Sequence, residues 1–255
     1  MTTVDTHVLD DKVQQMYRQV AEQPHGNYHF EMGRPLAQRL GYPAALLRAA
    51  PVEAVESFAG VGYFFDLANL QPGQRVLDLG SGSGMDTFVA AHLVAPSGRV
   101  LGVDFTQEQL DKARRLAAAA QLGAAVEFWQ RRIEVLPAGD AEFDCVISNG
   151  VINLSADKKR VFTEVARVLR PGGYLAVADI VTERQLTDAI VSNADLWASC
   201  VGGAAREDAY RALIEMSGLE VREVRPNNYG FRSEQARGAT STYGVKSLSL
   251  LAVKP

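Results

Sequence analysis

The sequence is short of the residues that build disulfide frameworks, metal clusters and membrane spans. Its 255 residues include two cysteines, Cys145 and Cys200, too few for a disulfide framework or, alone, for a four-ligand zinc site. We therefore predict no metal site. No apolar run approaches the roughly 20 residues of a membrane-spanning helix. The first seven residues are polar and lack the apolar core of a signal peptide, so we expect a cytoplasmic protein with no membrane partner.

An excess of charge of one sign is also absent. Lysine and arginine number 26 against 30 aspartates and glutamates, a net charge of -4, which gives no electrostatic reason to expect a nucleic-acid partner. The length is ample for one α/β domain with its own core. The bulk properties fit a cytosolic enzyme and leave its oligomeric state open.

What the sequence does contain is a glycine-rich turn between an apolar strand and a helix. The stretch Val76-Leu-Asp-Leu-Gly-Ser-Gly-Ser-Gly84 is followed by Arg99-Val-Leu-Gly-Val-Asp104, a second strand that ends in an acid. Glycines allow the backbone to approach a ligand closely, and an acid at the tip of the second strand accepts ribose hydroxyls. Together these features predict a nucleoside-binding β-α-β unit.

The spacing of this turn favours S-adenosylmethionine over a dinucleotide. A pyrophosphate turn requires G-x-G-x-x-G, whereas here Gly84 comes one residue early and Met85 holds the third position. Asp78, at the exit of the first strand, would repel a pyrophosphate but would receive the ammonium of an amino acid. The sequence therefore predicts S-adenosylmethionine as the cofactor.

From residue 74 onward, strands and helices alternate as in a parallel sheet with crossover helices. Residues 1–70 are expected to form an N-terminal helical cap that belongs to the same unit, and residues 71–255 the cofactor-binding domain. Strands are expected at 75–79, 99–103, 126–129, 144–148, 174–181, 220–224 and 245–253. Helices are expected at 4–21, 36–40, 85–94, 107–121, 157–169, 187–200 and 206–217, with a polar loop at 225–242.

Five segments together carry a resemblance to a known family. They are Leu77-Asp-Leu-Gly-Ser-Gly-Ser-Gly84, Gly102-Val-Asp-Phe-Thr-Gln-Glu-Gln-Leu110, Val146-Ile-Ser-Asn-Gly-Val-Ile-Asn-Leu154, Arg167-Val-Leu-Arg-Pro-Gly-Gly173 and Leu196-Trp-Ala-Ser-Cys-Val-Gly-Gly-Ala204. The chain resembles the class I S-adenosylmethionine-dependent methyltransferases, and among them the arsenite and the ubiquinone/menaquinone methyltransferases. This resemblance implies an α/β fold with a Rossmann-like, seven-stranded sheet, in which the last hairpin inserts one antiparallel strand.

The resemblance also implies a cofactor site, residue by residue. Gly80, Ser81 and Gly82 would line the methionine and ribose side. Asp104 would hold the ribose hydroxyls, and Phe105 would lie against the adenine. The residues implied at the adenine edge and beside the sulfonium are Arg132, Ile133, Glu134, Asn149 and Val151.

Arsenic chemistry is where the sequence departs from these relatives. Arsenite methyltransferases hold trivalent arsenic with thiolates, because a soft metalloid prefers sulfur ligands. The resemblance implies such cysteines at Gly150, around residues 61–63 and at Cys200, and only Cys200 is a cysteine here. Cys145 lies within a strand and is expected to be a small buried hydrophobe. A single thiolate would need external thiols such as glutathione to complete the site.

A general base is needed only where the acceptor must lose a proton, because methyl transfer is an in-line displacement that depends on alignment. Tyr28 and His29 are the candidate catalytic residues, and His29 would serve as a base near neutral pH. Glu31 and Asp179 are further candidates.

Asn153, Trp197 and Cys200 are the candidate residues for binding a small-molecule acceptor. Trp197, with Tyr210, would either wall an apolar acceptor pocket or pack in a helix core. The third segment lacks the Asn-Pro-Pro-Tyr arrangement of enzymes that methylate adenine or glutamine. Three functions stay open: a methyltransferase for a small organic molecule, a thiol-assisted arsenite methyltransferase, and a binding protein of this fold without catalysis.

Overall fold

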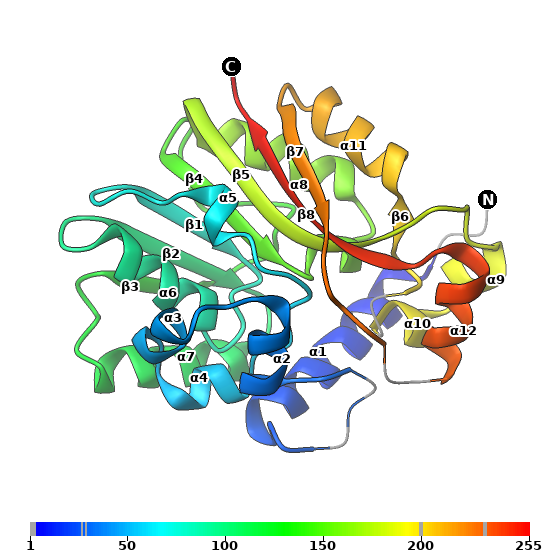
Figure 1. Ribbon diagram of the computed structural model, residues 1–255, viewed down its shortest axis with the longest axis horizontal. Coiled ribbons are helices and arrows are strands. Elements are labelled where there is room, and N and C mark those ends of the chain that lie inside the picture. Colours follow the sequence, from blue (N-terminus) through cyan, green and yellow to red (C-terminus); the bar gives the residue numbers. More distant parts are fainter. Residues whose placement is uncertain (1–3, 27, 29, 199–200, 232–233) are drawn as a thin grey trace.

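A mixed sheet runs through the middle of the molecule, with helices against both faces (Figure 1). The structure is a computed structural model, which describes residues 4–26, 28, 30–198, 201–231 and 234–255. The strand order is β3-β2-β1-β4-β5-β8-β7, and β6 adds a short pairing to β5. The strands are β1 Arg75–Leu79, β2 Arg99–Asp104, β3 Val126–Gln130, β4 Phe143–Asn149, β5 Leu169–Thr182, β6 Ala205–Arg206, β7 Glu220–Pro226 and β8 Lys246–Val253.

The strand directions agree with the implied topology. β3, β2, β1, β4 and β5 are parallel neighbours, while β8 lies antiparallel between β5 and β7. In register, Asp78 of β1 pairs with Gly102 of β2 on one side and Ile147 of β4 on the other. The expected Rossmann-like sheet with one inserted antiparallel strand is confirmed.

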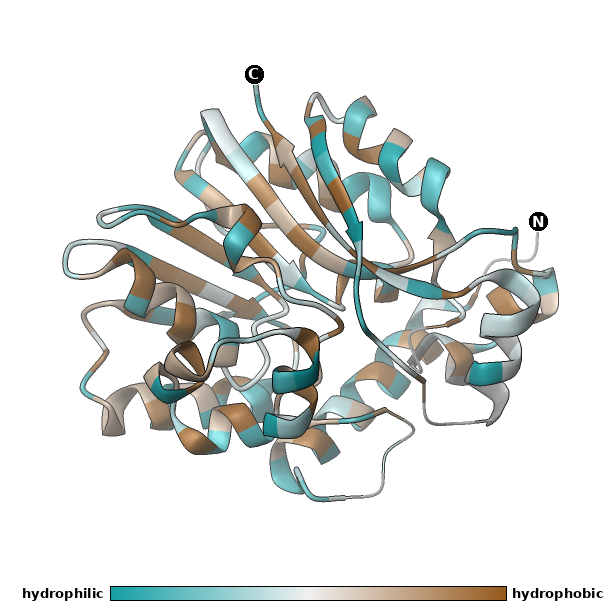
Figure 2. Cartoon of the chain, viewed as in Figure 1, coloured by the Kyte–Doolittle hydropathy of each residue, from teal (hydrophilic) through white to brown (hydrophobic). Residues whose placement is uncertain are grey.

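Successive residues of a strand point to opposite faces, so the sheet separates two hydrophobic cores. Val76 packs with helices α6 (Met85–Val94) and α7 (Gln107–Ala119), whereas its neighbour Leu77 packs with α8 (Lys158–Val168) and α11 (Glu207–Met216). Figure 2 shows the hydrophobic residues that follow the central strands. Because these strands are buried on both faces, their sequences are mostly continuous apolar runs rather than alternating apolar and polar residues.

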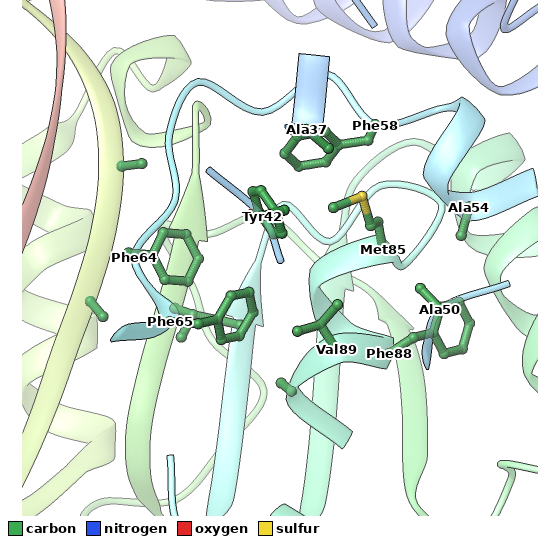
Figure 3. Packing of buried hydrophobic residues seen from close by; sticks show 14 of the residues in the cluster. Ala37, Tyr42, Ala50, Ala54, Phe58, Phe64, Phe65, Met85, Phe88 and Val89 are labelled. Carbon is green, nitrogen blue, oxygen red and sulfur yellow. The ribbon is translucent and has the colours of Figure 1, made fainter. Parts of the chain in front are cut away.

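The N-terminal region forms helices, and those within residues 33–68 pack into the first of these cores. Its helices are α1 Thr6–Glu22, α2 Gly33–Leu40, α3 Ala44–Ala49, α4 Val52–Glu56 and α5 Phe65–Ala68. Figure 3 shows Tyr42, Phe64 and Phe65 from this region beside Met85 and Val89 of α6. Residues 33–68 therefore share a core with the sheet.

Two expectations about the C-terminal third are wrong. Residues 225–242 are not one polar loop, because they contain most of helix α12 (Glu234–Tyr243). The helix expected at 187–200 is divided into α9 (Asp188–Val191) and α10 (Ala194–Ala198), and its last two residues lie outside the described part of the chain. The break has a local cause, since the Asn193 side chain accepts the Leu196 N–H at 3.2 Å and begins a new helix.

None of the helices in the described ranges is long and apolar enough to span a bilayer.

Candidate cofactor and methyl-transfer site

A cavity lies at the carboxyl ends of β1, β2 and β4. The chain runs outward from β1 to β3 and then returns to β4 on the other side of β1, and ligands of open α/β sheets bind at such a switch point. The cavity encloses about 1040 Å³ of space, part of which is open to solvent. Every residue predicted to meet the cofactor lines it: Asp78, Gly80, Ser81, Gly82, Asp104, Phe105, Arg132, Ile133, Glu134, Asn149 and Val151.

The glycine turn forms the floor of this cavity. Gly80, Gly82 and Gly84 have φ values of 66°, 52° and 93°, a left-handed conformation that glycine adopts without strain. A Cβ on Gly80 would lie 2.3 Å from a methyl carbon of Val151, so this position also has no room for a side chain. The Ser81 hydroxyl is buried and has no hydrogen-bond partner among the described residues. The turn thus presents backbone and an unused polar atom at the cavity.

Asp104 is oriented by backbone donors. The Gly82 N–H donates to one carboxylate oxygen at 3.0 Å, and the Thr106 N–H donates to the other at 2.8 Å. Each oxygen keeps a second lone pair, so the carboxylate has acceptors left for two ribose hydroxyls. Desolvation raises the pKa of Asp104, and its backbone hydrogen bonds oppose that rise.

Asp78 is a buried carboxyl group with no cation beside it. Its side chain accepts a 2.6 Å hydrogen bond from the Thr87 hydroxyl, and none of the described lysine, arginine or histidine side chains forms an ion pair with it. Burial, with the nearby charge of Asp86, raises the pKa of Asp78 to about 8. A ligand ammonium would supply the missing positive charge, which fits the methionine end of S-adenosylmethionine.

Asp86, Tyr42 and Asn149 form a buried network that sequence reasoning did not foresee. The Tyr42 hydroxyl donates to one oxygen of Asp86 at 2.7 Å, and the Asn149 amide donates to the other at 2.9 Å. The Asn149 carbonyl oxygen accepts the Val61 N–H at 2.7 Å. Asn149 therefore ties the end of β4 to both the N-terminal region and α6. Only the place of Asp86, two residues after the glycine turn, was a usable signal.

Helix α1, the first helix of the expected N-terminal cap, covers the cavity, but the sequence did not show which of its residues line it. Asp10, Val13 and Tyr17 of α1 are lining residues. Arg132 pairs with Asp10 at 2.6 Å, and its guanidinium carbon lies 5.8 Å from the centre of the Phe105 ring. The group predicted at the adenine edge therefore also holds α1 in place.

Tyr28 and Glu31, the described candidate catalytic residues of the N-terminal region, do not line the cavity. Tyr28 stacks on Phe30 at 5.6 Å and donates its hydroxyl to the Gln23 carbonyl at 2.8 Å, whereas His29 lies outside the described residues. Glu31 pairs with Arg39. Asp179 is fully buried below the site, where it accepts from the Tyr210 hydroxyl at 2.8 Å.

Asn153 and Trp197, the described candidate acceptor residues, are also absent from the cavity lining. Asn153 is fully buried beneath the cavity wall, and Trp197 packs in a small cluster with α1. Tyr210 packs edge-on against Phe162 at 5.2 Å, the helix-core alternative. Cys200 lies outside the described residues.

Two positions at which the resemblance implied cysteines are glycines with close neighbours. A Cβ at Gly150, whose φ is 73°, would lie 3.1 Å from Val61. A Cβ at Gly62 would lie 2.2 Å from the Asn227 amide nitrogen. Cys145 is fully buried, and burial raises its pKa well above the usual thiol range, as expected for a small hydrophobe. Within the described ranges, no group of three or more His, Cys, Asp or Glu side chains could hold a metal ion.

Residues 70–220 match the family described as a methyltransferase domain. The chain belongs to that family. This methyltransferase is 40% identical over 192 residues to the arsenite methyltransferase of Halobacterium salinarum, covering 75% of this chain and 49% of that protein. Over 161 residues it is 37% identical to the ubiquinone/menaquinone biosynthesis C-methyltransferase of Hahella chejuensis, covering 60% of this chain and 63% of that protein.

A solved structure gives the same family. The arsenic(III) S-adenosylmethionine methyltransferase from Chlamydomonas reinhardtii has a TM-score of 0.64 and 31% identity, covering 88% of this chain and 74% of that one. The methyltransferase spans about half the length of the arsenite methyltransferases from Halobacterium salinarum and Aquipseudomonas alcaligenes. Its cofactor is S-adenosylmethionine, as the glycine turn and the two acids predict.

Proposed function

We propose that this methyltransferase transfers the methyl group of S-adenosylmethionine to a small organic molecule. The observation that carries the proposal is the local structure at Gly62 and Gly150. A Cβ at Gly62 would overlap Asn227 and Ala178, and Gly150 has a φ of 73°, which is strained for a side chain. The cavity wall contributed by residues 58–60, with Val13 and Leu154, is apolar, which suits an organic acceptor.

In this proposal the described residues bind the cofactor, align its methyl group with the acceptor and exclude water. S-adenosylmethionine, when bound, supplies an electrophilic methyl group on a sulfonium. Asp78 takes the ammonium, and Asp104 takes the ribose hydroxyls. The sulfonium end of the cofactor lies among Gly80, Asn149 and Val151. Holding the methyl donor and the acceptor in a fixed geometry lowers the entropy cost of bringing them together. Helix α1 closes the cavity from above, so that the sulfonium is shielded from hydrolysis.

Arsenite is the second candidate acceptor, and the named relatives are the observation that favours it. It would require Cys200 together with external thiols, since a soft centre prefers sulfur ligands. A catalytically inactive binding protein is the least favoured alternative, because such a protein does not need the intact glycine turn, Asp78 and Asp104.

An assay with labelled S-adenosylmethionine separates these functions. One arm supplies arsenite with glutathione, and the other supplies a panel of phenols, quinones and amines. We expect labelled product from the organic panel. Efficient arsenite turnover with none from the panel would contradict the proposal, and cofactor binding without turnover in either arm would favour the inactive protein.

Cys200→Ser distinguishes the two acceptor classes directly. If arsenic is the natural acceptor, the serine variant should lose arsenite methylation, because a hydroxyl is a poor ligand for a soft centre. With an organic acceptor we expect little change, and Gly150→Cys should gain no arsenite activity because its φ of 73° is strained for a side chain. Cys145→Ser is the matched control for loss of a thiol by itself.

A further inference from the structure

The cavity wall between β4 and α8 is held from beneath by two buried charged side chains. This wall contains the short helix η1 (Ile152–Leu154), and Val151, Leu154 and Ser155 line the cavity. On its protein side, the Asn153 N–H donates to the Asp179 carboxylate at 2.9 Å. The Lys158 ammonium donates to the carbonyls of Asn153 and Ser155 at 3.0 and 2.8 Å. The wall is therefore clamped at its backbone from below.

The same ammonium contacts a second segment. Lys158 is 9% exposed, and its Nζ lies 4.9 Å from the centre of the Trp197 ring in α10. The Trp197 indole N–H donates to the Val191 carbonyl at 2.7 Å, which fixes the ring plane. A desolvated ammonium over an indole face is attracted by the ring quadrupole. Lys158 thus joins the cavity wall to α10.

Two glycines bring the chain after α10 against this contact. A Cβ on Gly202 would lie 2.4 Å from the Trp197 ring, and a Cβ on Gly203 would lie 2.0 Å from the Asn153 carbonyl oxygen. The Leu196 carbonyl accepts the N–H groups of Val201 and Gly202 at 3.0 and 2.8 Å. The fifth sequence segment is therefore docked on the wall at both of its ends.

Helix α10 also packs against the helix that covers the cofactor cavity. Val4, Leu9 and Val13 of the N-terminal region form a small cluster with Ala194 and Trp197, and Leu154 of the wall packs on it. Figure 1 shows α1 and α10 close together below the sheet. A displacement of the wall would therefore reach both α10 and α1.

We propose that Lys158 is a positioning residue that transmits cofactor occupancy from the 151–155 wall to helix α10 and to residues 201–206. The cofactor contacts Val151 and Leu154 on one side of the wall, and Lys158 carries their position to Trp197 on the other. The proposal rests on the cofactor half of the proposed function and not on the identity of the acceptor.

A purely structural role is a weak explanation for this lysine. Burying a charge costs free energy that hydrogen bonds return only in part, and an apolar side chain of equal size is often as stable. The charges of Asp179 and Glu134 favour the ammonium but do not offset the effect of burial, which lowers the pKa of Lys158. The ammonium donates to the wall and lies over the Trp197 ring, so it joins the wall to α10.

Hydrogen exchange with and without S-adenosylhomocysteine tests the proposal on the whole chain. In the wild type we expect the ligand to slow exchange at 80–84 and 104–106, where it binds, and also in α10 and at 201–206. In Lys158→Met, protection in α10 and at 201–206 should be lost while protection at 80–84 remains. Lys158→Arg should restore part of it, because a guanidinium also donates to carbonyls and stacks on indole.

The neighbouring Lys159→Met is the matched control, since Lys159 is exposed on the same helix. If Lys158→Met does not fold, Trp197→Leu breaks the same link from the other side and should give the same loss. Ligand-dependent protection in α10 and at 201–206 that persists in these variants, or is missing in the wild type, would overturn the proposal. Calorimetry with S-adenosylhomocysteine reports separately on cofactor binding, so absence of binding would refute the proposed cofactor site instead.

Discussion

The Asp104 carboxylate has two tasks, because the groups that orient it also shape the glycine turn. Its oxygens accept the N–H groups of Gly82 and Thr106, and we propose that their remaining lone pairs accept the ribose hydroxyls. The bound ribose would therefore meet an acceptor that is already aligned. This saves the entropy cost of ordering the Asp104 side chain on binding.

Asp104→Ala should weaken binding of S-adenosylhomocysteine about ten- to a hundredfold. Loss of a charged hydrogen-bond partner costs roughly 1.5–3 kcal/mol, and the freed turn adds to that loss. Asp104→Asn should fall between the alanine variant and the wild type, because it keeps one acceptor oxygen. Titration calorimetry measures the effect, with exposed Asp111→Ala as control. Equal affinities for Asp104→Ala and the wild type would remove Asp104 from the site.

At this scale the sequence predicted the residues that belong to motifs and missed those that come together only in the fold. The glycine turn and Asp104 sit at fixed offsets from strand ends, so their place at the cavity followed from the pattern. Tyr42 reaches the site from the turn between α2 and α3, and Asp10 from α1, and their own neighbours in the sequence carry no signal of it. Contacts with distant residues, Tyr42 with Asp86 and Asp10 with Arg132, place them there.

Among the elements, α1 is the one whose position most affects access to the cofactor. It contributes Asp10, Val13 and Tyr17 to the cavity lining. The side chains of Gln109 and Lys112 on α7 donate to the carbonyls of Tyr17 and Ala21 at 2.8 and 3.0 Å. Both hydrogen bonds are only partly buried, and Leu9 and Val13 of α1 pack in a small cluster apart from the two main cores. Such limited burial is typical of an element that opens locally.

Binding of S-adenosylhomocysteine should slow hydrogen exchange in residues 6–22 and 57–60. Asp10→Ala, which breaks the pair with Arg132, should raise the ligand dissociation rate by up to about fivefold, because a partly exposed pair contributes about 0.2–1 kcal/mol. Helix α11 on the opposite face serves as the internal control. Unchanged exchange in α1 would show that the helix is a fixed part of the fold.

The elements were predicted best where apolar periodicity is strong. The strand at 75–79 and the helix at 85–94 agree with β1 and α6 residue for residue. Helix α12 was missed because residues 234–243 include a single large apolar side chain, Tyr243, and so present no apolar stripe. The division of 187–200 depends on the Asn193 side-chain hydrogen bond, which periodicity does not detect.

At the scale of the whole molecule, the site contains buried aspartates whose ionisation lowers the free energy of unfolding. Burial raises the pKa of Asp78 to about 8 and that of Asp86 to about 6, against about 3.9 for an unfolded aspartate. At a pH between the unfolded and the folded pKa of each aspartate, the folded chain holds a proton that the unfolded chain releases. The free energy of unfolding therefore falls as pH rises from about 4 to 8. Burial lowers the pKa of Lys158 to about 8. This lysine makes the free energy of unfolding rise with pH, but only above about pH 8.

Between pH 6 and 8, Asp78 is the acid of this pair that still titrates, and it sets the last prediction. The free energy of unfolding of the ligand-free protein should fall by at most about 1.4 kcal/mol per pH unit, and Asp78→Asn should flatten this slope. Saturating S-adenosylhomocysteine should also reduce the slope, because its ammonium pairs with the ionised carboxylate and restores the missing charge. Urea unfolding at pH 6, 7 and 8 measures all three states. Parallel pH profiles for the wild type and Asp78→Asn would mean that Asp78 is already ionised without ligand, and that the ammonium is held elsewhere.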